Sequence, residues 1–474
     1  MTKPGMTPMT RTGTNDAADA LWQMDHDHAL HPWTNFGPFE DKGSMVITRG
    51  QGCHIWDANG AKFFDAVGGM WCTNIGLGRR EMADAIAEQA MTLGFSNTFV
   101  DQTNAPAARL AAKLASLAPG DLNRVHLTTG GSTAVDTAYR MVHFYQSCMG
   151  RPEKTHVISR ERSYHGSTYI SQSIGKRNGD RVPQFRYKEE GIHHISSPDP
   201  YRAPDGMDAA AFCDFLIAEF EAKIAEVGSE RIGGFFAEPI QASGGVIVPP
   251  EGYLKRMAEV CRKHDILFIA DEVVTAFGRI GHWFASWDEF GFQPDIITCA
   301  KGLTSGYIPL GAMIFSDRIW QAMAQDGDRW FTSGFTYSGH PVASAAALKN
   351  IEIIEREDIL GNVATTGQYF EDRLRQLAHL PLVGEVRGRK FMICVENVAD
   401  KSTKRLLPEA LDVGRRVTET CEAAGLIVRP LGHLNVMSPP LTMTRSDVDF
   451  VAETLEKAIV KVTDDLVRDG VRIG

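Results

Sequence analysis

The feature that most constrains the fold of this chain is an alternation of short apolar runs with amphipathic stretches between Leu114 and Phe315. Such alternation is typical of repeated βαβ units, in which helices cross over a mainly parallel sheet. The runs that predict strands are RVHLTT (124–129), THVIS (155–159), GGFFAEP (233–239), ILFIAD (266–271), DIITCA (295–300) and PLGAMIF (309–315). The sequence therefore predicts an α/β fold.

Helical periodicity is clearest after a glycine pair, where Thr133–Ser147 carries apolar residues three and four apart and Ser132 stands at the expected N-cap. The same spacing occurs in three further segments, Tyr253–His264, Ala343–Arg356 and Arg445–Val467. In the last third of the chain, LIVRPLG (426–432) and NVMSPPL (435–441) are candidate strands. A smaller α+β domain is therefore expected to follow a boundary near residue 340.

Composition excludes several classes of protein. The chain has 474 residues, enough for about three domains of ordinary size or fewer large ones, and its net charge of −10 comes without a basic block, which argues against nucleic-acid binding. Eight scattered cysteines without a CxxC pair favour reduced thiols and a cytosolic location. The apolar runs are too short to span a membrane, and residues 1–20, polar and rich in threonine, predict a flexible arm.

A lysine and an acidic pair each follow a predicted strand. Lys301 comes directly after DIITCA, and Asp271 and Glu272 follow ILFIA, so all three are expected at the carboxyl edge of the sheet, where ligands bind. Singly, such a lysine is most often solvated, and an Asp-Glu pair is more often a metal ligand, helix cap or surface pair. No His or carboxylate cluster nearby completes a metal site. Together, the amine could form a Schiff base with an aldehyde and the carboxylate could neutralise a heteroaromatic nitrogen.

A third element is the segment TTGGSTAVDTA, which places Gly131 and Ser132 between a predicted strand and a predicted helix. Free backbone N–H groups and the positive end of the helix would hold a phosphate there, although the pattern is neither GxxxxGK nor GxGxxG. The segment SYHGST adds Tyr164 and His165. One cofactor would require the phosphate cradle, the reactive amine and the carboxylate together. Their combination is therefore a far more specific indication of such a cofactor than any of them alone.

These residues lie in a sequence that resembles the class III aminotransferases, pyridoxal phosphate enzymes of fold type I, and among them the ω-amino acid or amine:pyruvate transaminases. The resemblance extends from about Pro32 to Val467 and is carried by LFIADEVVTAFGRIGHWFAS (267–286) and PDIITCAKGLTSGYIPLGA (294–312). It implies a large cofactor-binding domain over residues 71–340 with a mainly parallel seven-stranded sheet. A smaller α+β domain would combine residues 21–70 with 341–474.

By this resemblance, Lys301 binds the cofactor covalently and moves the proton of the substrate, while Asp271 keeps the pyridine nitrogen protonated. Val273 and Tyr164 would pack on the two faces of the ring. The remaining cofactor-binding residues implied are His165 and Glu238.

The phosphate would be held by Gly131 and Ser132, helped by Thr336 of FTYSGHP, which in this family reaches across from the partner subunit. The resemblance therefore implies a homodimer, or a dimer of dimers, with shared active sites.

On the substrate side, Arg429 in GLIVRPLGH matches the mobile arginine of the amine:pyruvate group, and its planar fork suits a carboxylate. Ornithine and GABA aminotransferases carry an arginine just before an SPPL-like segment, where this chain has Val436, so pyruvate is favoured as acceptor. Trp71 matches an aromatic wall of the substrate pocket, and Phe95 is a second candidate for that wall; both residue types also serve as ordinary core aromatics.

The sequence thus predicts a transaminase that moves an amino group from an ω-amino acid or primary amine to pyruvate or a related keto acid. Two departures from the family pattern, Thr133 in place of an acid and Ala276 in place of glycine, bear on the shape of the pocket. The alternatives are a decarboxylating or aminomutase enzyme of the same fold, or a non-catalytic ligand-binding relative. β-Alanine, taurine-like sulfonates, diamines and arylalkyl amines all fit as donors.

Overall fold

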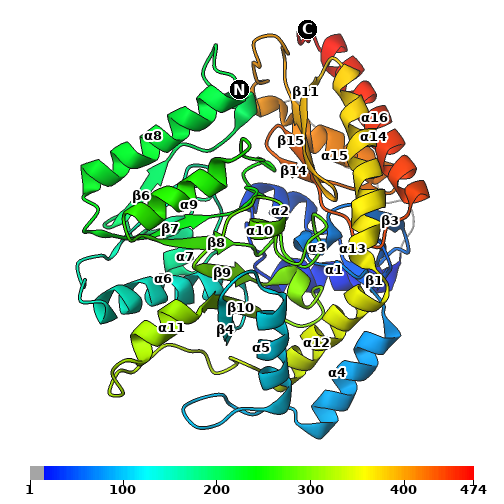
Figure 1. The fold of residues 1–474 in the computed structure, drawn as a ribbon. Coiled ribbons are helices and arrows are strands. Elements are labelled where there is room, and N and C mark those ends of the chain that lie inside the picture. The colour runs from blue at the N-terminus through cyan, green and yellow to red at the C-terminus, as the bar shows by residue number, and fades with distance from the viewer. Residues whose placement is uncertain (1–14) are drawn as a thin grey trace.

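The computed structural model describes residues 15–474, and a seven-stranded sheet forms its centre (Figure 1). The strands are ordered β4–β10–β9–β8–β7–β5–β6. Their bounds are β4 Leu122–Thr128, β5 His156–Arg160, β6 Ile192–Ile195, β7 Ile232–Ala237, β8 Leu267–Asp271, β9 Ile296–Cys299 and β10 Gly311–Ser316. Strand β10 runs antiparallel to β4 and β9, whereas β9, β8, β7, β5 and β6 pair in parallel. The predicted mainly parallel seven-stranded sheet is confirmed.

The central strands are continuous apolar runs because both of their faces are buried. Phe235 and Phe268 share a core with α8 (Ala209–Val227) and α9 (Tyr253–Lys263), whereas the next residues along, Phe236 and Ile269, pack with α6 (Gly131–Cys148). Figure 1 shows α8 and α9 on one side of the sheet and α6 with α11 (Asp317–Ala324) on the other. The sheet is therefore the middle of three layers.

The six predicted strands all form, but the seventh, β6, has no counterpart among the predictions. Its sequence IHHI is half polar, so no apolar run announces it. The four predicted helices correspond to α6, α9, α12 (Pro341–Arg356) and α16 (Arg445–Arg468).

Two local predictions are wrong. Ser132 is not the N-cap of α6, because the helix already begins at Gly131, with Gly130 as the cap residue and no capping side chain. The predicted arm 1–20 is too long, because α1 (Asp16–His28) starts inside it, with the Asn15 side chain accepting from the N–H of Ala18. Residues 1–14 of that arm lie outside the described residues.

Two smaller sheets flank the large one. The first has the order β1–β2–β3–β13, and its strands are Ile47–Gln51, His54–Asp57, Lys62–Asp65 and Leu426–Ile427. The second has the order β11–β12–β15–β14, with strands Val383–Arg389, Met392–Asn397, Leu434–Met437 and Arg429–Leu431. Because β3 pairs with β13, residues near the two ends of the chain lie side by side.

The remaining helices connect these sheets. They are α2 Phe36–Lys42, α3 Gly68–Trp71, α4 Arg80–Thr92, α5 Ala105–Leu117, α7 Tyr169–Ile174, α10 Ala285–Asp288, α13 Ile359–Asn362, α14 Gln368–Arg375 and α15 Val413–Ala423. Helix α12 packs on both α4 and α5 and leads from the large sheet to α14 and β11. No helix among residues 15–474 is long and apolar enough to cross a membrane.

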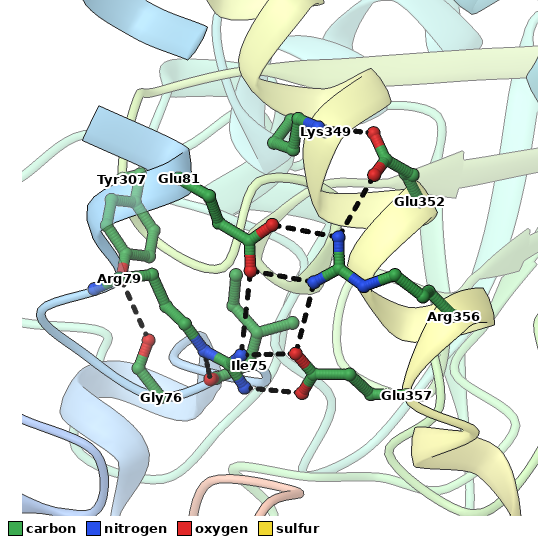
Figure 2. Close-up of polar contacts among 9 residues, drawn as sticks. All are labelled: Ile75, Gly76, Arg79, Glu81, Tyr307, Lys349, Glu352, Arg356 and Glu357. Atoms are coloured by element: carbon green, nitrogen blue, oxygen red, sulfur yellow. Dashed lines mark hydrogen bonds and ion pairs between the residues drawn. The ribbon is translucent and has the colours of Figure 1, made fainter. Parts of the chain in front are cut away.

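A crossed ion network joins the start of α4 to the end of α12 (Figure 2). Arg79 donates to both carboxylate oxygens of Glu357 at 2.6 and 2.8 Å, and Arg356 donates to both oxygens of Glu81 at 2.9 and 2.8 Å. The Nε of Arg79 also donates to the carbonyl of Ile75 at 2.9 Å. Two cations and two anions alternate, so the network ties residues 75–81 to the helix that leaves the large sheet.

We expect this network to contribute measurably to stability. A double-mutant cycle of Arg79→Met with Glu357→Gln should give a coupling free energy of unfolding of about 1 kcal/mol, which shrinks in high salt. Urea unfolding measures it. The control is the exposed pair Arg80–Asp84, at 2.7 Å, for which Arg80→Met with Asp84→Asn should couple by no more than about 0.5 kcal/mol. Equal coupling in the two cycles would contradict the prediction.

Candidate active site

A cavity of about 510 Å³ opens at the carboxyl edge of the large sheet. Its volume lies within the range of sites that hold small molecules and cofactors. Ten of the twelve predicted site residues line this cavity. They come from the ends of β8 and β9, from α3, from the starts of α6 and β14, and from the loops after β5 and β7, so the fold brings these distant segments to one point.

The buried acid at the end of β8 is held on both of its oxygens. Asp271 Oδ2 accepts from Nδ1 of His165 at 2.8 Å, and Oδ1 accepts from the backbone N–H of Val273 at 3.2 Å. The side chains of Asp271 and His165 are 4% and 0% exposed. Because an ionised carboxylate only accepts hydrogen bonds, Nδ1 of His165 carries the hydrogen. Its Nε2 is buried without a hydrogen-bond partner among the described residues.

The amine at the end of β9 belongs to Lys301. Its backbone lies in the left-handed region, at φ 47°, which costs about 1 kcal/mol for a residue with a side chain. Burial lowers the pKa of the Lys301 amine, and the Asp271 carboxylate acts in the opposite direction. The lowered pKa increases the neutral fraction of the amine, which is the form that attacks a carbonyl or accepts a proton.

The start of α6 forms a cradle from the backbone of Gly131 and the hydroxyl of Ser132. At Gly131 a Cβ would lie 3.1 Å from both terminal methyl carbons of Val273, so a larger residue would crowd the cavity wall. Ser132 Oγ accepts from the N–H of Ser167 at 3.0 Å, which leaves its own hydrogen for a ligand. The partial positive charge at the first turn of this 18-residue helix favours an anion. These features suit a phosphate group.

Glu238 supports the wall of the cavity through its neighbours. Its Oε1 accepts from the backbone N–H of Tyr164, and its Oε2 accepts from that of Ala242, both at 3.0 Å. Burial raises the pKa of the Glu238 carboxyl and of the Tyr164 hydroxyl. Since both carboxyl oxygens are used on the backbone, Glu238 fixes the loop that carries the Tyr164 ring.

The outer part of the cavity contains Trp71 and Arg429. Trp71 is buried on a left-handed backbone with φ 64°, and its Nε1 has no hydrogen-bond partner in the described structure. Arg429 donates from Nη1 to Sδ of Met70 at 3.0 Å, a weak acceptor, and within residues 15–474 no carboxylate forms an ion pair with it. Burial lowers the pKa of Arg429, and the nearby Arg177 lowers it further. Its guanidinium is available to an anionic ligand.

Two predicted site residues do not line the cavity of their own chain. The Phe95 ring is half exposed and packs against Tyr337 and His340, with ring centroids 6.0 and 5.9 Å away. Thr336, directly before Tyr337, is likewise absent from the residues that line the cavity. Their assigned roles stay predictions, and both belong to one pair of packed loops.

Several further residues that line the cavity were not predicted from the sequence. Pro32 and Trp33 come from the N-terminal segment, Met70 from α3, and Arg177 from the loop after α7. No periodicity or motif singles out loop residues of this kind. The one available signal was the spacing of Arg177 and Asp180, opposite charges three residues apart.

The residues of the cavity fit pyridoxal 5′-phosphate. The cofactor needs an amine for its aldehyde, an acid for its ring nitrogen and N–H donors for its phosphate. Lys301, Asp271 and the start of α6 supply these groups around a single cavity. In the described part of the chain, no cluster of three or more His, Cys, Asp or Glu side chains is arranged to hold a metal ion.

Comparison with known proteins gives the family. A sequence model of the class III aminotransferases matches residues 38–459. The putrescine–pyruvate aminotransferase of Pseudomonas aeruginosa is 42% identical over 92% of this chain and 95% of its own length. The (S)-enantioselective ω-transaminase of Thermomicrobium roseum is 40% identical, with a TM-score of 0.91 over 94% of this chain and 99% of that one.

A third relative bears on the cofactor. An amine transaminase from an uncultivated Pseudomonas species, solved in its PLP-bound form, is 38% identical and superimposes with a TM-score of 0.87 over 92% of this chain and 99% of its own. The chain is an enzyme of the class III aminotransferase family and uses pyridoxal 5′-phosphate as its cofactor.

Proposed function

We propose that this aminotransferase transfers an amino group from a primary amine or ω-amino acid to pyruvate or a closely related keto acid. The observation that carries the proposal is the position of Arg429, which lies in the cavity that holds Lys301 and has no acidic partner among residues 15–474. A keto acid acceptor brings a carboxylate, which the guanidinium binds with two hydrogen bonds. The activities named for the relatives in Pseudomonas aeruginosa and Thermomicrobium roseum support the same reading.

An amine donor must occupy the same cavity without a carboxylate. Arg429 tolerates this because its one hydrogen bond within the described structure is to the Met70 thioether, and little is lost when a flexible side chain leaves such a weak acceptor. The walls formed by Trp71 and Ile240 are apolar and suit the carbon skeleton of the donor. One arginine can therefore serve both half-reactions.

Bound pyridoxal phosphate supplies a carbonyl that condenses with amines and a ring that accepts electrons from the substrate carbon. In our proposal, the Lys301 amine would hold the resting cofactor covalently, and the freed amine would accept the proton of the substrate carbon as general base. Asp271, fixed by His165, would keep the ring nitrogen protonated, because a buried carboxylate favours a neighbouring cation. Tyr164 and Val273 would pack on the ring, and Gly131 with Ser132 would hold the phosphate.

We also propose that the enzyme is a homodimer in which Thr336 completes the phosphate site of the partner. Two packed loops support this, joined by a hydrogen bond from Thr98 Oγ1 to the carbonyl of Ser338 at 3.0 Å. They carry large apolar side chains that are exposed in the single chain, Phe95, Phe99, Val100, Trp330 and Tyr337, and the exposed Met91 lies in the last turn of α4, just before the first of these loops. An exposed apolar cluster of this kind is typical of a protein–protein interface.

For the location we propose the cytosol. All eight cysteines are unpaired and six of them are buried, as expected of a chain that folds with reduced thiols. For the domains we propose the sequence-based division, a large domain over 71–340 and a small one over 21–70 with 341–474.

The first prediction concerns the amine. Lys301→Ala should lose at least about a thousandfold in kcat, because no other base at the end of β9 replaces it. The variant should still bind pyridoxal phosphate through the phosphate contacts, which equilibrium dialysis measures. Turnover close to that of the wild type would refute the role of Lys301.

The second prediction tests the substrates. With a panel of amine donors, the wild type should form alanine from pyruvate in equal amounts to the amine consumed and release no carbon dioxide. Arg429→Ala should lose about tenfold to a hundredfold in kcat/KM for pyruvate and much less for a neutral arylalkyl amine. Arg429→Lys keeps the charge but not the planar guanidinium, so its kcat/KM for pyruvate should lie between those of the wild type and Arg429→Ala. Equal losses for acid and amine would argue that Arg429 has only a structural role.

The third prediction tests shared sites by complementation. Lys301→Ala and Thr336→Asp chains are each expected to be nearly inactive as homodimers. Mixed dimers combine the lysine of one chain with the threonine of the other in one of their two sites, so about a quarter of wild-type activity should return after random reassociation. If mixing restores nothing although mass analysis detects mixed dimers, Thr336 does not act across the interface.

A further inference from the structure

We propose that Arg177 and Asp180 form a positioning pair that holds Trp33 as the outer wall of the substrate cavity and thereby favours donors with an apolar or aromatic substituent. The proposal rests on the proposed function, since it concerns the donor of that same reaction. Arg177 and Trp33 both line the cavity that contains Lys301. Asp180 contacts both of them.

The first step is the attachment of the N-terminal segment. Trp33 Nε1 donates to Asp180 Oδ1 at 3.0 Å. In the described structure, the other hydrogen bonds of residues 29–35 join residues within 25–39. Examples are His31 with Asp25 at 2.9 Å and Thr34 with the carbonyl of His31 at 2.6 Å. Among the residues that the structure describes, the bond to Asp180 is thus the one hydrogen bond that joins residues 29–35 to the loop after α7.

The second step is the ion pair itself. Arg177 donates from Nε to Asp180 Oδ2 at 2.8 Å and from Nη2 to Oδ1, so the pair is bidentate. The two side chains are only 12% and 9% exposed, which screens them from water far more than a surface pair. The carbonyl of Asp180 also accepts from the Tyr187 hydroxyl at 3.1 Å. The loop therefore presents a rigid acceptor to Trp33.

The third step is the stacking of rings on the arginine. The guanidinium carbon of Arg177 lies 5.0 Å from the centroid of the Tyr164 ring and 5.7 Å from that of Trp33. The two rings lie 6.0 Å apart at 58°. Cation–π contacts at these distances are favourable, so Arg177 connects the ring on the cofactor side to the ring at the outer wall.

The fourth step is that Trp33 needs this support. Its backbone lies in the left-handed region, at φ 56°, and 57% of the residue is exposed. A large side chain in such a backbone persists only where surrounding contacts hold it. Because Trp33 is exposed, interior packing does not provide these contacts. Among the described residues, Asp180, Arg177 and Tyr164 contact the ring and fix it over the cavity.

The consequence concerns the choice of donor. With Arg177 neutralised by Asp180, the outer wall formed by the described residues presents an indole face beside the unpaired charge of Arg429. A donor with an aryl or alkyl substituent gains contact with the indole, whereas a short polar donor does not reach it. Removing the acid would release the indole and leave the Arg177 charge uncompensated.

The experiment compares Asp180→Asn and Trp33→Phe with a matched control, Asp412→Asn. Asp412 also pairs with an arginine three residues away, Arg415, at 2.7 Å, but on the surface. Both test variants should raise the KM for an arylalkyl amine about tenfold, as expected when a hydrogen bond to a charged group is weakened or lost. The KM for β-alanine should rise less than about twofold in Trp33→Phe, and in Asp180→Asn it should stay the same or fall, because the uncompensated Arg177 attracts the carboxylate. The control should change neither KM.

A second readout does not depend on activity. Acrylamide quenching of tryptophan fluorescence in the wild type minus that in Trp33→Phe reports the accessibility of Trp33. Asp180→Asn should increase the accessibility of Trp33 measured in this way, and Asp412→Asn should not. The proposal is overturned if the ratio of the two KM values is unchanged in both test variants, if Asp412→Asn gives the same shift, or if quenching stays the same. A wild type that forms no alanine refutes the proposed function alone, and the quenching result then still decides whether the pair positions Trp33.

Discussion

The site depends on one buried carboxylate. Removing the charge of Asp271 from water costs several kcal/mol unless hydrogen bonds replace the lost solvation, and here His165 and the backbone of Val273 provide them. Strand pairing then sets the place of the amine: Asp271 lies opposite Thr298 in the register of β8 with β9, and Lys301 follows three residues later. Acid and amine therefore meet at one sheet edge because neighbouring parallel strands end there.

The cavity also concentrates backbone strain. Trp33, Trp71 and Lys301 all line it, and all three have positive φ without being glycine. Each such residue costs on the order of 1 kcal/mol, which the surrounding structure must repay. In Lys301 the left-handed turn directs the chain away from β9 immediately after the strand. These backbone conformations fix the directions of the three side chains. The packed layers around the sheet provide the free energy of folding that offsets their cost.

How much the sequence could predict follows from how local each signal is. Lys301 and Asp271 were identifiable because each ends an apolar run, and the edge they share follows from the strands alone. Strand β6 escaped because IHHI hides its apolar character. The placement of Trp33 beside Arg177 depends on contacts across a large sequence separation, which no local pattern encodes. Thr336 differs again, since the site predicted for it involves a second chain. The substrate-wall role of Phe95 and the domain bounds also stay predictions.

The two arginines of the cavity illustrate why residue type alone does not assign a role. Arg177 has a bidentate acid partner and two rings around its guanidinium, so moving it would break contacts on every side. Within the described residues, Arg429 has one hydrogen bond, to a thioether, and no acid forms an ion pair with it, so in the proposed function it would gain more from a ligand's carboxylate than it loses by moving. The acid at position 180 thus separates an arginine that is fixed in the wall from the arginine that we propose as a mobile anion receptor, although both side chains share the same chemistry and the same cavity.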